Sequence, residues 1–161
     1  MEIVEEKRSV FSGIALIFSI IFAFISIMEF IHIGLSEPII FFFSSPGDAI
    51  FETTGLDHLM KGFISFVIFT LFLSAVIKLQ KGTIDGFAFL LGAAILSFGV
   101  GILFTMEWIA NIFNTLIIGI SDPEVWEEFT LTDGIRLEEF LGIASIYILM
   151  LWKNKEKYII Y

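Results

Sequence analysis

Residues 87–106 read FAFLLGAAILSFGVGILFTM, a run of 20 uncharged and mostly apolar residues. A helix needs about 20 such residues to cross a hydrocarbon core about 30 Å thick, so this stretch predicts a transmembrane helix. A second run, of 19 residues, lies at Val10–Met28. These two runs decide the fold class: we expect an all-α integral membrane protein.

Each of these two runs is followed along the chain by a shorter apolar run. They are Gly62–Ile77, with 16 residues, and Phe140–Trp152, with 13. The last run reaches spanning length only if its helix begins a few residues earlier, which places Glu138 and Glu139 in its first turns at the membrane surface. Acids are favoured there by the positive end of the helix dipole. The sequence therefore predicts four transmembrane helices.

The composition agrees with a membrane-embedded chain and excludes several functions. The 161 residues are 57% hydrophobic with a mean hydropathy of +0.93, whereas soluble domains are usually about 45–50% apolar. The absence of cysteine excludes disulfides, thiolate zinc sites and iron–sulfur clusters. A net charge of −9 argues against nucleic-acid binding, which needs a basic surface. Because no catalytic triad, phosphate-binding glycine loop or His-Glu-x-x-His motif occurs, we expect no enzymatic activity.

The basic residues predict the orientation of the spans, since Lys and Arg beside transmembrane helices stay on the cytoplasmic side. In a four-span chain, seven of the nine bases fall on one side: Lys7, Arg8, Lys78, Lys81, Lys153, Lys155 and Lys157. We expect a multi-pass protein of the cell membrane with both termini in the cytoplasm. The outer side then holds two bases, Lys61 and Arg136, and thirteen acids, a charge of −11.

Short matches between the two halves of the chain indicate an internal duplication. Met28-Glu29 matches Met106-Glu107 at a displacement of 78 residues, and Gly62-x-x-Ser65 matches Gly142-x-x-Ser145 at 80. The alternative is chance similarity between apolar helices. A true duplication predicts one membrane domain, residues 1–161, built of two hairpin repeats, 1–80 and 81–161. With an even number of spans each, the hairpins would insert in the same orientation.

Small residues recur at helical spacing on the first and third predicted spans. They form a stripe on each span: Ser12, Ala15, Ser19, Ala23 and Ser26, and then Ala93, Ser97, Gly101 and Thr105. Such stripes let helix backbones approach closely in lipid, so we expect helix packing. The alternative is that these hydroxyls line a narrow polar path.

The two predicted outer connections are too apolar to be solvated loops. Residues 30–54 contain a Phe41-Phe42-Phe43 cluster and two prolines, and residues 108–121 read WIANIFNTLIIGIS. We expect these segments to lie in the membrane interface, as a lid or an oligomer contact. The alternative is a re-entrant loop, which is tolerated where protein or a water-filled cavity satisfies the backbone.

Two pairs of residues are candidates for binding. Glu29 and Glu107 end the first and third spans on the outer side, where rings of carboxylates in an oligomer concentrate cations; the alternative is two carboxylates that simply face water. His32 stands three residues after Glu29, and His58 precedes the second span. Glu-x-x-His is a ligand spacing of helical metal sites, and two histidines can hold a haem. The alternative is that these side chains bind no ligand, because water and lipid headgroups can form their hydrogen bonds.

The chain resembles the YqhA-like family of small four-span prokaryotic membrane proteins. The resemblance rests on Glu29-Phe30-Ile31-His32 after the first span, the apolar stretch with prolines, and Asp57 just before the second span. It covers about half of the chain and implies only a small multi-span membrane protein.

Three functions follow from these features. The first is a homo-oligomeric channel or transport-type protein with a cation-attracting acidic outer face. The second is an accessory or scaffold subunit of a larger membrane complex, with the apolar outer segments as contact surfaces. The third is a haem- or metal-binding membrane protein. The expected partners are the lipid bilayer, copies of the chain or other membrane subunits, and cations. We expect no nucleic acid and, outside the third case, no cofactor.

Overall fold

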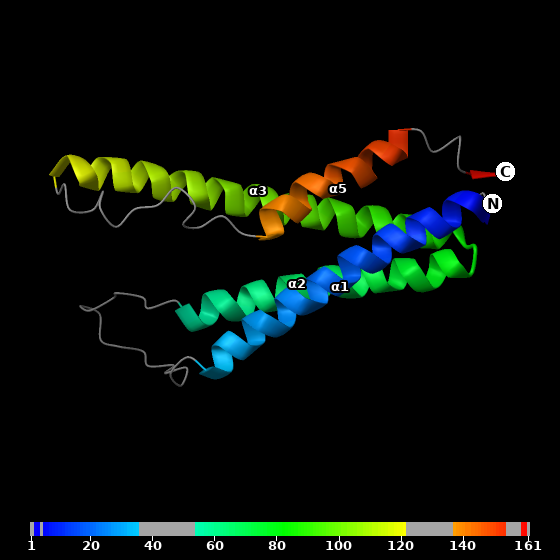
Figure 1. The fold of residues 1–161 in the computed structure, drawn as a ribbon, viewed down its shortest axis with the longest axis horizontal. Helices are drawn as coiled ribbons and strands as arrows, with labels where there is room; N and C mark the ends of the chain where they lie inside the picture. Colours follow the sequence, from blue (N-terminus) through cyan, green and yellow to red (C-terminus); the bar gives the residue numbers. More distant parts are fainter. Residues whose placement is uncertain (1, 4, 36–53, 122–136, 154–158, 161) are drawn as a thin grey trace. The chain divides into compact units, whose positions relative to one another are not determined.

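The computed structural model of the chain describes residues 2–3, 5–35, 54–121, 137–153 and 159–160 (Figure 1). The described residues form helices α1 (Glu5–Leu35), α2 (Thr54–Gln80), α3 (Ile84–Ser121) and α5 (Leu137–Lys153). Two short strands, β1 (Glu2–Ile3) and β2 (Ile159–Ile160), have two residues each. The expected helical architecture is therefore confirmed.

Three of these helices contain segments that are long and apolar enough to cross a membrane. The segments are Arg8–Ile31 in α1, Leu59–Gln80 in α2 and Ile84–Ile118 in α3. Each includes one of the uncharged runs identified in the sequence. The fourth run forms α5, which has 17 residues and is about 26 Å long at 1.5 Å per residue.

Helix α3 is much longer than its uncharged run. It continues through Glu107 to Ser121 for 38 residues in all. The prediction that residues 108–121 form a connection after the third span is therefore wrong, because this segment continues α3. Its role at the membrane interface or in an oligomer contact stays a prediction. The physical reason for the continuation is that a single charged side chain leaves the backbone hydrogen bonds intact. The first strong helix-breaking signal is Pro123, which disfavours helical geometry at the preceding residue. In the first connection, α1 extends to Leu35, and residues 36–53 lie outside the described part.

The chain divides into two compact units, Met1–Phe89 and Leu90–Ile160. The boundary falls inside α3, so the first unit holds α1, α2 and the beginning of α3. The second unit holds the remainder of α3 together with α5. Within each unit the two main helices run in opposite directions (Figure 1). The sequence-predicted repeats, 1–80 and 81–161, rest on the sequence matches alone.

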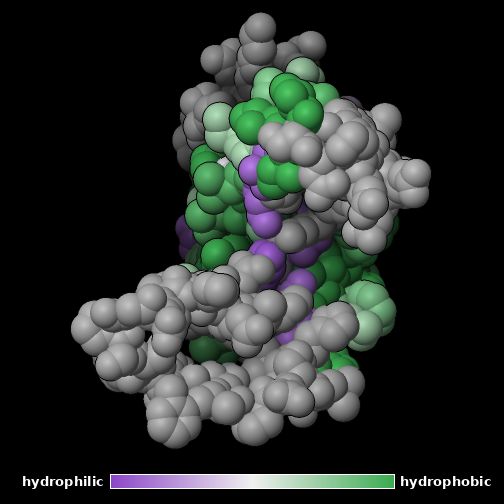
Figure 2. Space-filling model, turned by 90° about the vertical axis from the view of Figure 1, so that its left-hand side faces the viewer, coloured by the Kyte–Doolittle hydropathy of each residue, from purple (hydrophilic) through white to green (hydrophobic). Residues whose placement is uncertain are grey.

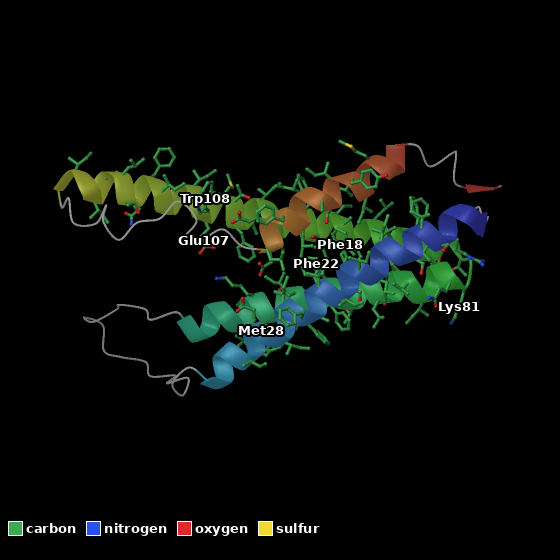
Figure 3. All side chains as sticks on the ribbon, viewed as in Figure 1. Phe18, Phe22, Met28, Lys81, Glu107 and Trp108 are labelled. Carbon is green, nitrogen blue, oxygen red and sulfur yellow. The ribbon has the colours of Figure 1, made fainter. Side chains whose placement is uncertain are left out.

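Aromatic side chains build the core of the first unit. The Phe72 ring of α2 is fully buried and lies 5.1 Å from the Phe18 ring and 6.1 Å from the Phe22 ring of α1. Phe18 and Phe22 stand one helical turn apart on α1 (Figure 3). A further ring pair joins Phe11 to Phe87 at 5.4 Å. Such pairs stabilise beyond the area they bury, so α1 and α2 form a well-packed hairpin.

A tight turn connects α2 to the start of α3. Gly82 has a positive φ of 75°, and the N–H of Thr83 donates to the carbonyl of Lys78 at 3.2 Å. This pattern is a Schellman C-cap, in which glycine takes the left-handed conformation that other residues avoid. Lys78 also forms a 3.2 Å ion pair with Asp85 across the turn. The turn thus ends α2 and fixes the direction in which α3 begins.

Large apolar side chains are exposed over much of the described surface. Ile17, Phe24, Leu103 and Ile117 each expose more than 55% of their area, and most of the coloured surface in Figure 2 is hydrophobic. A soluble monomer rarely exposes contiguous apolar patches of this kind. The surface is that of a protein surrounded by lipid or by other membrane helices.

Candidate functional site

Glu29 and Glu107, the predicted cation-binding carboxylates, belong to different units. Glu29 is half-buried near the end of α1, where its Cβ would lie 3.3 Å from a Cβ placed on Gly62 of α2. Glu107 is exposed on α3 and projects beside Trp108 from the part of the helix that extends beyond the start of α5 (Figure 3). Each carboxylate therefore stands near one end of a helix–helix contact within its own unit.

His32 and His58, the predicted metal or haem ligands, lie within α1 and α2. Their side chains are outside the described residues. Among the residues that the structure describes, no group of three or more His, Cys, Asp or Glu side chains is arranged to hold a metal ion. Binding of a metal or haem by His32 and His58 stays a prediction.

The small-residue stripe of α1 is partly buried in the first unit. Ala15, Ser19 and Ser26 are buried, while Ser12 and Ala23 are half-buried. Ser26 donates a hydrogen bond from Oγ to the carbonyl oxygen of Gly62 at 3.0 Å. This bond joins α1 to α2 directly, so at this position the hydroxyl serves helix packing.

The stripe of α3 forms a still closer contact in the second unit. Ala93 and Ser97 are fully buried, Gly101 is buried and Thr105 is half-buried. A Cβ placed on Gly101 would stand 2.8 Å from the Cα of Gly142 on α5. The two helices thus cross with their backbones in contact, a geometry that only small residues permit.

Glu138 and Glu139, in the first turn of α5, are both buried. Their exposed fractions are 6% and 8%, and their place at the membrane surface stays a prediction. The cause of this burial is the position of α5 along α3. The first turn of α5 packs beside Gly101, and a Cβ there would lie 3.3 Å from the carbonyl oxygen of Glu138. Since α3 continues well beyond this level, the start of α5 coincides with the middle of a longer helix.

A cavity of about 140 Å³ adjoins the crossing of α3 and α5. Its lining is Phe98, Gly101, Ile102, Thr105, Met106, Glu139, Gly142 and Ile143. Thr105 donates from Oγ1 to the Gly101 carbonyl at 2.8 Å, which leaves the hydroxyl oxygen able to accept. Among the described residues, Glu139 Oε1 and Ser97 Oγ are buried side-chain atoms that have no hydrogen-bond partner.

Sequence reasoning did not single out Glu139 as a site residue. The signal available was its place in the first turn of a short apolar helix, and that signal pointed to the membrane surface.

A second cavity, of about 330 Å³, lies in the first unit between the start of α1 and the end of α2. It is lined by Arg8, Ser9, Ser12 and Gln80. Of the predicted site residues, Ser12 lines this cavity, and Gly101 and Thr105 line the one beside Glu139.

Comparison with known proteins places the chain in a family. The family model described as MJ0565 integral membrane domain matches residues 6–154. The resemblance to the YqhA-like family is not confirmed. No significant match is found among curated proteins or among solved structures. The family match and the three long apolar helices together establish a multi-pass integral membrane protein. The chain belongs to the MJ0565 integral membrane domain family.

Proposed function

We propose that this small polytopic membrane protein is of the channel or transport type, rather than an enzyme, and that it works as a homo-oligomer with a cation-attracting acidic outer face. The observation that carries the proposal is the extension of α3 beyond α5 (Figure 1). At 38 residues, α3 is about 57 Å long, whereas the hydrocarbon core is only about 30 Å thick. Part of its apolar surface therefore needs a cover other than lipid tails.

The extension of α3 carries an exposed stripe with the spacing of a helix–helix seam. Its members succeed one another at intervals of three, four, three and four residues: Met106, Ile109, Phe113, Leu116 and Ile120. All five are exposed, and Ile120 exposes 85% of its area. Apolar residues that alternate in this way form the seam of helices that pack side by side. A second copy presents the same stripe, so self-association covers it.

The seam leaves Glu107 accessible. Glu107 precedes Ile109 by two residues, which places it about 160° away around the helix at 100° per residue. Oligomerisation through the stripe would thus keep Glu107 exposed, on the side that the basic residues predict to be external. Glu29 ends α1 on the same predicted side. Carboxylates at the outer ends of the helices raise the local concentration of cations.

We also propose that the two hairpins are tandem repeats inserted in the same orientation, with α5 as a fourth span and both termini cytoplasmic. Supporting this, the matched glycines Gly62 and Gly142 each contact the preceding helix of their own unit. The contacts differ in register. Gly142 contacts Gly101 on α3. Gly62 contacts Ser26 and Glu29 on α1, which lie one to two turns beyond the residue that the duplication aligns with Gly101.

The mass of the purified protein in detergent tests the oligomer. We expect the wild type to be an oligomer and Phe113→Ala combined with Leu116→Ala to shift it toward the monomer. Ile118→Ala is the matched control, because Ile118 is exposed on the same stretch of α3 but lies on the opposite side from the stripe. A monomeric wild type at every concentration, or equal masses for both variants, would contradict the proposal.

A second candidate function, an accessory subunit of a larger membrane complex, is favoured by α1. This helix exposes its own stripe at the same spacing: Ile17, Ile20, Phe24, Ile27 and Ile31. The stripe lies within the spanning segment, where lipid or the helix of another subunit can cover it. A monomer in detergent that conducts no cations would favour this function over the first.

A further inference from the structure

We infer that the cavity between the start of α1 and the end of α2 binds the headgroup of an anionic phospholipid, with the guanidinium of Arg8 on the lipid phosphate. The cavity lies within the first unit, and the inference depends neither on self-association nor on ion flux. It therefore goes beyond the function proposed above.

The side chains that line this cavity are hydrogen-bond donors. Three come from α1 and one comes from α2: Arg8, Ser9, Ser12 and Gln80. Their guanidinium, hydroxyl and amide groups all donate, and none of these four residues is acidic. The three residues of α1 lie within about 100° of one another around the helix. Donors that converge on one volume beside a positive charge suit the oxygens of an anion.

The guanidinium of Arg8 is held at the edge of the turn that ends α2. Arg8 is half-buried, and its Nη1 would lie 3.1 Å from a Cβ placed on Gly82. Lys81 projects from the same turn (Figure 3) and is exposed, so it adds positive charge nearby. Because a guanidinium has five N–H donors, Arg8 can bind a phosphate through two of them and keep its contacts within the protein.

The cavity lies at the level where lipid phosphates are found. Arg8 begins the first membrane-spanning segment, Arg8–Ile31, and Gln80 ends the second, Leu59–Gln80. These segments have 24 and 22 residues and are therefore about 36 Å and 33 Å long. The hydrocarbon core is about 30 Å thick, and the headgroup layers extend it to about 40–45 Å. The ends at Arg8 and Gln80 thus lie in a headgroup layer.

The surface next to the cavity suits the tails of a lipid. Leu16 follows Ser12 by one helical turn, and Ile77 precedes Gln80 by one turn, so both lie closer to the middle of the membrane on the same helix faces. Both side chains are exposed, by 44% and 47%. A polar cavity that continues into exposed apolar side chains favours a lipid over a free phosphate ion.

The size and access of the cavity agree with a headgroup. Its volume of about 330 Å³ falls within the range of about 300–1,000 Å³ that is typical of small-molecule sites. Ser9 and Gln80 are exposed, so the donors are accessible from outside the protein. Basic pockets between membrane helices are a general means of binding anionic headgroups.

The test measures the affinity of the purified full-length protein in a neutral detergent for dihexanoyl phosphatidylglycerol, by native mass spectrometry. Dihexanoyl phosphatidylcholine is the uncharged comparison with the same tails. We expect phosphatidylglycerol to bind at least about fivefold more tightly than phosphatidylcholine. Arg8→Gln should weaken phosphatidylglycerol binding about fivefold or more. Lys81→Gln, the matched control, removes the same charge outside the cavity lining and should weaken binding by less than about twofold at physiological ionic strength.

Gln80→Glu keeps the inference testable if Arg8→Gln fails to fold, because Gln80 is exposed at the end of α2. This variant keeps the shape and places a negative charge in the lining, so it should weaken phosphatidylglycerol binding about fivefold or more. Equal affinities of the wild type for the two lipids, or equal losses in Arg8→Gln and Lys81→Gln, would overturn the inference. Inorganic phosphate that displaces phosphatidylglycerol at equal concentration would assign the cavity to a free anion and would also overturn it.

Discussion

Gly101 and Gly142 bring the backbones of α3 and α5 into direct contact: a Cβ placed on Gly142 would stand 2.7 Å from the Cα of Gly101. The same Cβ would lie 3.1 Å from the carbonyl oxygen of Ser97. In lipid, close packing of this kind replaces the hydrophobic drive that holds soluble helices together. The contact therefore fixes where along α3 the shorter helix lies, and with it the burial of Glu139.

Gly142→Ala should destabilise the second unit, because the added methyl group cannot fit against the Gly101 backbone without separating the helices. Overpacking of this kind costs about 1–3 kcal/mol, measured by thermal or denaturant unfolding in detergent. Gly99→Ala is the control on α3, since a Cβ at Gly99 meets no atom within 4 Å. We expect Gly99→Ala to be as stable as the wild type or slightly more so. Equal stability of the two alanine variants would show that the helices do not cross at Gly142.

Ser26→Ala should weaken the first unit, since it removes the hydrogen bond to the Gly62 carbonyl. Hydrogen bonds between membrane helices contribute about 0.5–1 kcal/mol, so the expected loss is small but measurable in the same unfolding experiment. Ser9→Ala, at an exposed position near the start of α1, should leave the stability unchanged. A Ser26→Ala variant as stable as the wild type would mean that the bond contributes nothing to the hairpin.

Ser97→Ala should behave in the opposite way, although Ser97 is also a buried serine of a small-residue stripe. Its Oγ has no hydrogen-bond partner among the residues that the structure describes. Burying an unsatisfied hydroxyl costs about 1–3 kcal/mol, so its removal should leave the unfolding free energy unchanged or raise it. A loss as large as that of Ser26→Ala would indicate a partner for the hydroxyl and would argue against this difference between the two serines.

Phe72→Ala should be the most damaging of these substitutions in the first unit. The Phe72 ring is fully buried between Phe18 and Phe22, and loss of a buried phenylalanine typically costs about 3–5 kcal/mol. Phe63→Ala, on the same helix but with a largely exposed ring, should cost much less. The helical content and the unfolding midpoint of both variants in detergent check this difference. Similar losses at the two positions would mean that α2 does not pack on α1 through Phe72.

The positions of the helices follow from the sequence, because long uncharged runs have one low-energy conformation in lipid. The end of α3 does not follow from hydropathy. A search for uncharged residues stops at Glu107, whereas the backbone hydrogen bonds of the helix continue to Ser121. A helix ends where its backbone geometry is disfavoured, so Pro123 was a better guide than Glu107.

The candidate site is predictable only in part. The spacing of small residues indicates that Gly101 lies on a packing face, but the contact with Gly142 depends on the position of α5 along α3. That register is set by three-dimensional packing and has no signature within either helix. The same register decides the environment of Glu139. A carboxylate in a first helical turn is exposed when two helices start level, and becomes buried when its partner extends farther.

Cation flux into liposomes that contain the purified protein tests the central claim most directly. The wild type should pass sodium or potassium ions, and Glu29→Gln combined with Glu107→Gln should lower the flux by about twofold to tenfold, because the outer carboxylates no longer concentrate cations. The control combines Glu6→Gln with Glu156→Gln, two acids on the predicted cytoplasmic side, in protein oriented with its outer side facing the added ions. This control should retain the wild-type flux. Absence of flux in the wild type, or an unchanged flux after both outer carboxylates are removed, would contradict the claim.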